Sequence, residues 1–163
     1  MTDYSVRHRH RLKNKVIKKL ADQIERLYSM KIDLSSSVMD SATVNNFEVI
    51  IVDKEILFIK LNDQPCLTVR GILKFRPEHK FVTVDMGAVK FVTNGADIMA
   101  PGIVDADPEI NVDDIVWIRD ENHKQPLAIG RALMTGPDMV MNDSEKAVKS
   151  IHYVNDKLWK TQI

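Results

Sequence analysis

The glycines within residues 87–102 constrain the fold of this chain most strongly. Gly87, Gly95 and Gly102 fall in this one short apolar segment. Glycine adopts backbone angles closed to other residues and lets a second backbone or a ligand approach closely. Pro101–Gly102 matches the central pair of a type II turn, and Gly95 fits the residue that follows a helix. The segment therefore predicts corners of a small β-structure, a surface where main chain meets a ligand, or both.

The bulk composition predicts a soluble protein with a true core. The chain has 163 residues, 44% hydrophobic and 28% charged, which suits one large domain or two small ones. No apolar run approaches the roughly 20 residues that span a bilayer, and the polar, basic start does not resemble a signal peptide. The single cysteine, Cys66, excludes an intrachain disulfide and a cysteine zinc cluster. We therefore expect a cytoplasmic protein without membrane association.

Charge is distributed unevenly although the net charge is zero. Residues 1–31 contain nine Lys or Arg against three acids, a net of +6, and the remainder of the chain carries −6. Such asymmetry favours an electropositive end that meets phosphate, although a solvated helix face would have the same composition. The candidate phosphate contacts are Arg7, Arg9, Arg11, Lys13, Lys15, Lys18 and Lys19.

The first half of the chain predicts an α/β arrangement. Apolar residues at three- and four-residue spacing, from Leu12 to Leu27, predict an amphipathic helix over residues 9–30. Residues 31–46 are rich in Ser, Asp and Asn and predict a connector. Two β-branched runs then flank Asp53-Lys54 and predict a hairpin, followed by a third strand over 64–69 and a short helix over 70–75.

The pattern breaks at Arg76-Pro77-Glu78, where we place a boundary between domains 1–77 and 78–163. Beyond it, residues 80–85 predict a strand. Residues 87–96 predict a short helix because Ala88, Phe91 and Val92 share one helical face. The later short, turn-bounded apolar segments predict a small closed β-barrel with few helices.

Enzyme signatures are missing from the sequence. It contains no GxSxG, GxxxxGK[ST], GxGxxG or HExxH motif, and its five histidines lack ligand spacing. The acids between Asp105 and Asp114 lack the calcium-loop pattern and predict a solvated acidic loop. We therefore expect no catalytic residues, no metal site and no cofactor.

The second half resembles the PUA domain, an RNA-binding module found in pseudouridine synthases and archaeosine transglycosylases. Its Gly-Ala, Gly-Ala, Pro-Gly pattern is met by Gly87-Ala88, Gly95-Ala96 and Pro101-Gly102. Its terminal His, Asp and Trp resemble His152, Asp156 and Trp159. The sequence departs from the usual pattern at Glu145, where many PUA domains have glycine.

With Leu12–Leu20, the hairpin and the segment Pro65–Phe75, nearly the whole chain resembles the malignant T-cell-amplified sequence family. The resemblance implies an α+β N-terminal (pre-PUA) domain followed by a mostly-β PUA pseudobarrel. It also implies a non-catalytic RNA-binding protein that engages tRNA or small-subunit rRNA in translation initiation or recycling. The implied partners are RNA, the small ribosomal subunit and a protein with an initiation-factor-like domain.

The resemblance also implies RNA contacts along the Gly-rich loop, the first helix of the domain and its last strand. Physically, small residues in the loop expose backbone groups to an unpaired nucleotide, and Tyr153 can stack on a base. The candidate RNA-binding residues are Lys90, Asn94, Gly95, Ala96, Asp97, Ile98, Met99, Pro101, Gly102, Arg131, Lys146, Lys149, His152 and Tyr153.

Three other functions stay open from the sequence. The chain could be a trans-acting RNA-binding accessory to a modification enzyme such as a pseudouridine synthase, because PUA domains are often fused to such enzymes. It could be an enzyme with chemistry in its N-terminal domain, where Asp33, Asp40 and Asp53 form no recognised set. It could also be a protein–protein module whose acidic 105–114 stretch binds a basic partner.

Overall fold

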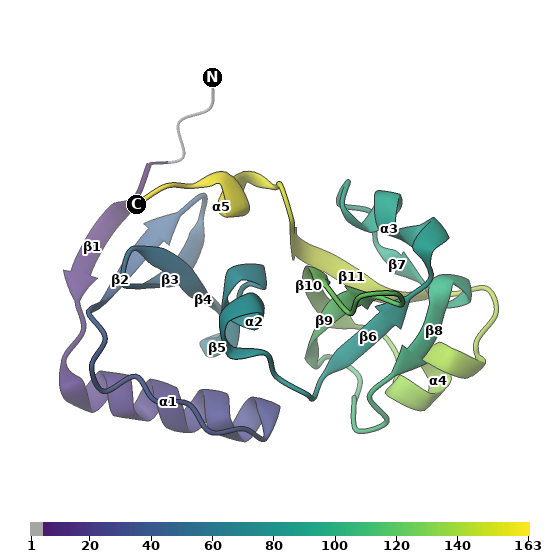
Figure 1. Cartoon of the computed structure of the whole chain (residues 1–163), viewed down its shortest axis with the longest axis horizontal. Helices are drawn as coiled ribbons and strands as arrows, with labels where there is room; N and C mark the ends of the chain where they lie inside the picture. Colours follow the sequence, from purple (N-terminus) through teal and green to yellow (C-terminus); the bar gives the residue numbers. More distant parts are fainter. Residues whose placement is uncertain (1–4) are drawn as a thin grey trace. The chain divides into compact units, whose positions relative to one another are not determined.

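The chain forms two compact units in the computed structural model, which describes residues 5–163 (Figure 1). The first unit contains residues up to Pro77 together with Lys157–Ile163, and the second contains Glu78–Asp156. The division after Pro77 coincides with the break in sequence pattern. The last seven residues belong to the first unit, whereas we expected them in the second.

A five-stranded antiparallel sheet, with strands in sequence order, forms the centre of the first unit. Helix α1 contacts β5, and α2 contacts β4 and β5. Along β3, four successive residues from Val49 to Val52 are buried, which shows that both faces of the central sheet are covered. The strands are β1 (Arg7–Arg11), β2 (Met39–Val44), β3 (Phe47–Val52), β4 (Glu55–Leu61) and β5 (Gln64–Leu67), and the helices are α1 (Asn14–Tyr28), α2 (Val69–Phe75) and α5 (Lys157–Lys160).

The expected hairpin, third strand and short helix of this unit are confirmed. Asp53 and Lys54 both have positive φ angles, 48° and 75°, as a two-residue type I′ turn requires. Thr68 caps α2, because its side chain accepts a hydrogen bond from the Gly71 backbone N–H.

Two expectations for this unit are wrong. Helix α1 begins at Asn14 rather than near residue 9, so Arg7–Arg11 forms the edge strand β1. The 31–46 connector contains β2, which pairs with β1 and β3. Its polar residues concealed it: Asp40 is buried within the strand, where Arg9 and Arg11 neutralise it.

A six-stranded sheet in the order β7-β11-β10-β9-β6-β8 forms the second unit. The sheet curls on itself (Figure 1). It encloses a core of aliphatic side chains that includes Val82, Ile118 and Val148. Only β6 and β9 pair in parallel. The strands are β6 (Phe81–Val84), β7 (Ile98–Met99), β8 (Ile103–Ala106), β9 (Ile115–Asp120), β10 (Pro126–Ala132) and β11 (Lys146–Tyr153), with α3 (Met86–Val92), the 3₁₀ turn η1 (Ala100–Gly102) and α4 (Gly136–Met141) between them.

This arrangement confirms the expected fold class, an α+β unit followed by a mostly-β pseudobarrel. The barrel is open rather than closed, because β7 and β8 are the edges of the sheet and η1 links them. The expected type II turn at Pro101-Gly102 is wrong, since both residues lie in η1. Within residues 5–163, no helix combines the length and apolarity needed to cross a membrane.

Candidate nucleic-acid interface

A groove of about 500 Å³ lies between α3 and the Gly-rich segment of the second unit; we call it the α3 groove. Six of the candidate residues line it: Ala96, Asp97, Ile98, Met99, Pro101 and Gly102. The remaining lining residues come from the start and one face of α3: Asp85, Gly87, Ala88, Phe91 and Val92. Small residues make up much of the wall, so the main chain lies near the surface there.

Helix α3 forms one side of the α3 groove, and none of the residues on that side is among the candidate RNA-binding residues. Asp85 caps the helix, because its Oδ1 accepts the Ala88 backbone N–H at 2.9 Å. Phe91 leaves 57% of its surface exposed, and Met99 is also exposed across the groove. The sequence contained the signal for this side, since Ala88, Phe91 and Val92 were predicted to share a face. That face lines the groove rather than packing entirely into the core.

Gly95 lies outside the groove and shapes the loop that forms it. Its φ is +89°, a left-handed conformation that favours glycine. A Cβ there would lie 2.8 Å from the Tyr153 ring, so the loop and β11 are in close contact. Asn94, in the same turn, is exposed, and Tyr153 is partly buried against the core.

Asp97 ties this loop to the last strand. Its Oδ1 accepts the Ser150 backbone N–H at 2.9 Å, and its Oδ2 lies 2.9 Å from Lys146 Nζ. The hydrogen bond from Lys146 is the largest cause of a lowered Asp97 pKa. Ile98 follows with its side chain buried and pairs with Val148. Asp97 and Ile98 thus fix the loop, whereas Met99 offers its side chain to the groove.

The other candidates in the second unit do not line the groove. Lys90 lies beside the Phe91 ring, with Nζ 5.1 Å from its centroid. Arg131 and Lys149 are cross-strand partners on β10 and β11, and Arg131 is 3.9 Å from Asp113. His152 is buried, and its Nδ1 lies 2.8 Å from Asp156 Oδ2, so its side chain is not on the surface.

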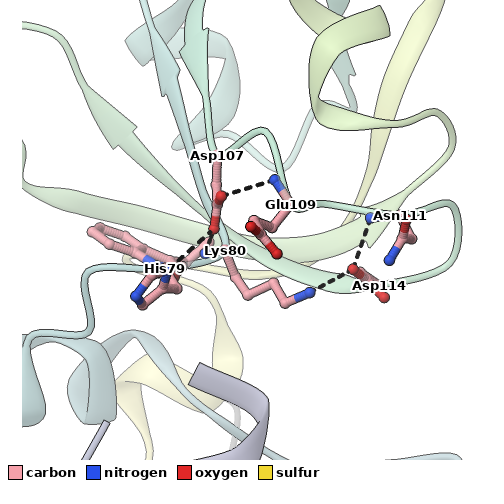
Figure 2. Close-up of polar contacts among 7 residues, drawn as sticks. His79, Lys80, Asp107, Glu109, Asn111 and Asp114 are labelled. Atoms are coloured by element: carbon pink, nitrogen blue, oxygen red, sulfur yellow. Dashed lines mark hydrogen bonds and ion pairs between the residues drawn. The ribbon is translucent and has the colours of Figure 1, made fainter. Parts of the chain in front are cut away.

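Hydrogen bonds within the acidic 105–114 segment and with Lys80 organise this segment (Figure 2). Asp107 is buried and accepts the backbone N–H groups of Lys80 and Glu109, while Lys80 Nζ contacts Asp114 Oδ2 at 2.6 Å. These carboxylates therefore hold the start of β6 against the loop. Among residues 5–163, no group of three or more His, Cys, Asp or Glu side chains is placed to hold a metal ion.

The candidate phosphate contacts of the first unit fall on two elements. Arg7, Arg9 and Arg11 are exposed on β1, and Arg9 and Arg11 both contact Asp40. Lys13 precedes α1, and the exposed residues Lys15, Lys18 and Lys19 lie on the helix itself. These seven cations share one unit, but the α3 groove belongs to the other.

Family models cover most of the chain in two parts. The PUA domain model matches residues 80–154, and the model of a domain of unknown function (DUF1947) matches residues 8–74. A solved structure of a hypothetical protein from Pyrococcus horikoshii is similar, with a TM-score of 0.80 and 34% identity. That similarity covers 93% of this chain and 98% of the other.

Three curated relatives extend the comparison. An uncharacterized protein of Methanocaldococcus jannaschii is 42% identical over 156 residues, covering 94% of this chain and 96% of the relative. Translation machinery-associated protein 20 of Saccharomyces cerevisiae is 30% identical over 161 residues, covering 93% and 87%. Malignant T-cell-amplified sequence 2 of Homo sapiens is 34% identical over 116 residues, covering 69% and 64%.

Proposed function

Because this chain belongs to the family of PUA-domain proteins that includes translation machinery-associated protein 20 and the malignant T-cell-amplified sequence proteins, we propose that it binds RNA in translation. Its ligand is tRNA or small-subunit rRNA, and it acts without catalysis. The α3 groove is the observation that carries this proposal, because it joins exposed apolar side chains to a wall of small residues.

The groove suits an unpaired base better than a phosphate. Phe91 and Met99 offer apolar surface on opposite sides, and stacking of a base on an aromatic ring is worth about 1–3 kcal/mol. The charged residues that line the groove, Asp85 and Asp97, are both acidic. Sequence-specific RNA recognition uses single-stranded bases that are splayed from their neighbours, which such a groove can accept.

Binding of fluorescent tRNA and small-subunit rRNA fragments, measured by anisotropy over a range of KCl concentrations, tests the proposal. Phe91→Ala should weaken binding about tenfold, consistent with the loss of one stacking contact. Met141→Ala is the matched control, because Met141 is an exposed apolar residue of α4 outside the groove. Failure of the wild-type protein to bind either RNA at low salt, or equal affinities for wild type and Phe91→Ala, would contradict it.

We also propose that the protein acts on the small ribosomal subunit together with a protein bearing an initiation-factor-like domain. Co-sedimentation with small subunits, with and without nuclease treatment, tests this part. Binding that survives Phe91→Ala but disappears after nuclease treatment would place the RNA contact outside the α3 groove.

A further inference from the structure

Positive charge is concentrated in the unit that lacks the α3 groove. The first unit contains 16 Lys or Arg and 9 Asp or Glu, a net of +7. The second contains 7 Lys or Arg and 14 Asp or Glu, a net of −7. Attraction of the phosphate backbone supplies a large part of nucleic-acid affinity. This charge distribution favours phosphate contacts in the first unit.

Two arginines of β1 are held in a fixed arrangement by a buried carboxylate. Arg11 lies directly opposite Asp40 in the β1–β2 register, and its Nε lies 2.6 Å from Asp40 Oδ1. Arg9 is two residues earlier, and its Nε lies 2.7 Å from Asp40 Oδ2. Because alternate residues of a strand share a face, both guanidinium groups lie on the same side of the sheet.

This cluster is more than a neutral ion pair. One carboxylate faces two guanidinium groups, so the three residues carry a net charge of +1. The Asp40 side chain is only 7% exposed, whereas those of Arg9 and Arg11 are 44% and 68% exposed. Each arginine contacts Asp40 through Nε, and within residues 5–163 the terminal nitrogens of both have no hydrogen-bond partner. Those nitrogens are donors with a planar geometry that fits phosphate oxygens.

A groove adjoins the two guanidinium groups. It has a volume of about 370 Å³ and is lined by Arg9, Arg11, Val38, Asp40, Ile51, Asp53 and Lys54. Val38 is an exposed aliphatic residue, and Ile51 is a buried residue of β3 that pairs with Asp40. A nucleotide could therefore place its phosphate on the guanidinium groups and its sugar or base against Val38.

The geometry points to Arg9 and Arg11, fixed by Asp40, as a clamp for the phosphodiester backbone of single-stranded RNA. We call these three residues the arginine clamp. This inference rests on the proposed function and places phosphate contacts in the first unit, which carries the net positive charge. The two arginines are two strand steps apart, roughly 6.6 Å along β1, so they can contact successive phosphates.

Charge beyond the clamp favours RNA over an acidic protein segment. Exposed lysines continue along α1, at Lys15, Lys18 and Lys19, and Arg7 precedes the clamp on β1. A regularly charged polyanion can neutralise cations spread over two elements, and nucleic-acid backbone has this regular charge. An acidic peptide is therefore the competing occupant that the experiment must separate.

Arg11→Gln tests the clamp with the smallest risk to folding. Glutamine keeps an amide donor near Asp40, and Arg9 remains to neutralise the buried carboxylate. Lys31→Gln is the matched control, because it removes one positive charge from a side chain of the same unit that is 96% exposed. A triple variant, Arg9→Gln, Arg11→Gln and Asp40→Asn, removes both cations without leaving a buried carboxylate unpaired.

Anisotropy with a labelled single-stranded RNA of mixed sequence gives affinity and its salt dependence. Arg11→Gln should weaken binding about tenfold and reduce the slope of log K against log[KCl] by about 0.7, the value for one phosphate contact on a single strand. The triple variant should reduce the slope by about 1.4. Lys31→Gln should leave the slope within error of the wild type. Thermal melts establish that each variant is folded.

The outcomes separate the clamp from the α3 groove. If Phe91→Ala loses RNA affinity and the folded triple variant does not, the clamp is wrong and the proposed function stands. If the wild-type chain binds no RNA, both fail. A third outcome would overturn the inference. In it, a glutamate-rich peptide binds the wild type and binds Arg11→Gln more weakly, while both proteins bind RNA equally well. The site then takes an acidic protein segment.

Discussion

Substitution of Gly95 by alanine should destabilise the second unit by about 2–3 kcal/mol. Two effects contribute. A non-glycine residue in a left-handed conformation costs about 1–2 kcal/mol, and Gly95 has a φ of +89°. The added Cβ would also lie 2.8 Å from the Tyr153 ring, which must shift to relieve the overlap at a cost of about 1 kcal/mol.

A double-mutant cycle separates these two effects. In a Tyr153→Ala background, the ring is absent and only the backbone strain remains, so Gly95→Ala should cost about 1 kcal/mol less than in the wild type. The loss in the wild-type background should appear as a lower urea midpoint with an unchanged slope, because the exposed surface on unfolding does not change.

The two tryptophans allow this measurement on one unit at a time. Trp117 lies in β9 of the second unit, and Trp159 lies in α5 of the first. In a Trp159→Phe background, urea unfolding followed by Trp117 fluorescence therefore reports the second unit. A Gly95→Ala midpoint equal to that of the parent, or an equal loss with and without the Tyr153 ring, would refute the role of the Gly95–Tyr153 contact.

Three further predictions concern the first unit. Burial raises the pKa of the Cys66 thiol to about 12, so the native protein should react with a thiol reagent at pH 8 only as fast as the first unit unfolds; rapid stoichiometric labelling without urea would contradict this. Hydrogen bonds from Arg11 and Arg9 lower the Asp40 pKa below its unfolded value near 4. The stability that Asp40 contributes is therefore present above pH 4 and is lost as pH falls through the folded pKa. Asp40→Asn should lower the melting temperature at pH 6 and reduce the difference between the melting temperatures at pH 6 and pH 3. An unchanged difference would contradict the stabilising role of the Asp40 carboxylate. Thr68→Ala should cost about 2 kcal/mol in urea unfolding followed by Trp159, because Thr68 both caps α2 and donates to the Ile56 carbonyl at 2.7 Å; a loss below about 0.5 kcal/mol would contradict it.

Local sequence signals predicted the elements whose apolar patterns match their burial. The hairpin around Asp53-Lys54 has two nearly continuous β-branched runs, and both strands are largely buried. In the hairpin the local preference and the tertiary environment agree, so the pattern alone was sufficient. The face shared by Ala88, Phe91 and Val92 also predicted α3, although several of its residues favour strands and the face lines the α3 groove rather than the core alone.

The sequence patterns did not predict strands β1 and β2, because ion pairs between residues far apart in the chain stabilise them. The sequence of β1, Arg-His-Arg-His-Arg, has no apolar alternation, and all five residues are exposed. Asp40 interrupts the pattern of β2, and its burial depends on two arginines 29 and 31 residues away. Local sequence patterns cannot pair residues across that separation, so the periodicity of α1 predicts a helix that includes part of β1.

Only part of the α3 groove and its surroundings could be predicted from the sequence, because contacts between distant residues shape the rest. The Gly-Ala and Pro-Gly pattern located the main-chain wall of the α3 groove at Ala96–Gly102. It could not show that Gly95 packs against Tyr153, that His152 is buried beside Asp156, or that Lys146 is paired with Asp97. The Gly95–Tyr153 and Lys146–Asp97 contacts depend on the placement of β11 relative to a loop some 50 residues earlier, whereas the His152–Asp156 contact is local in sequence.

The return of residues 157–163 to the first unit makes that unit discontinuous in sequence, with the whole second unit inserted between Pro77 and Lys157. Leu158 is buried, and the Trp159 ring lies 3.9 Å from the Arg70 guanidinium. The first unit therefore obtains these contacts only from residues that are translated after the entire second unit.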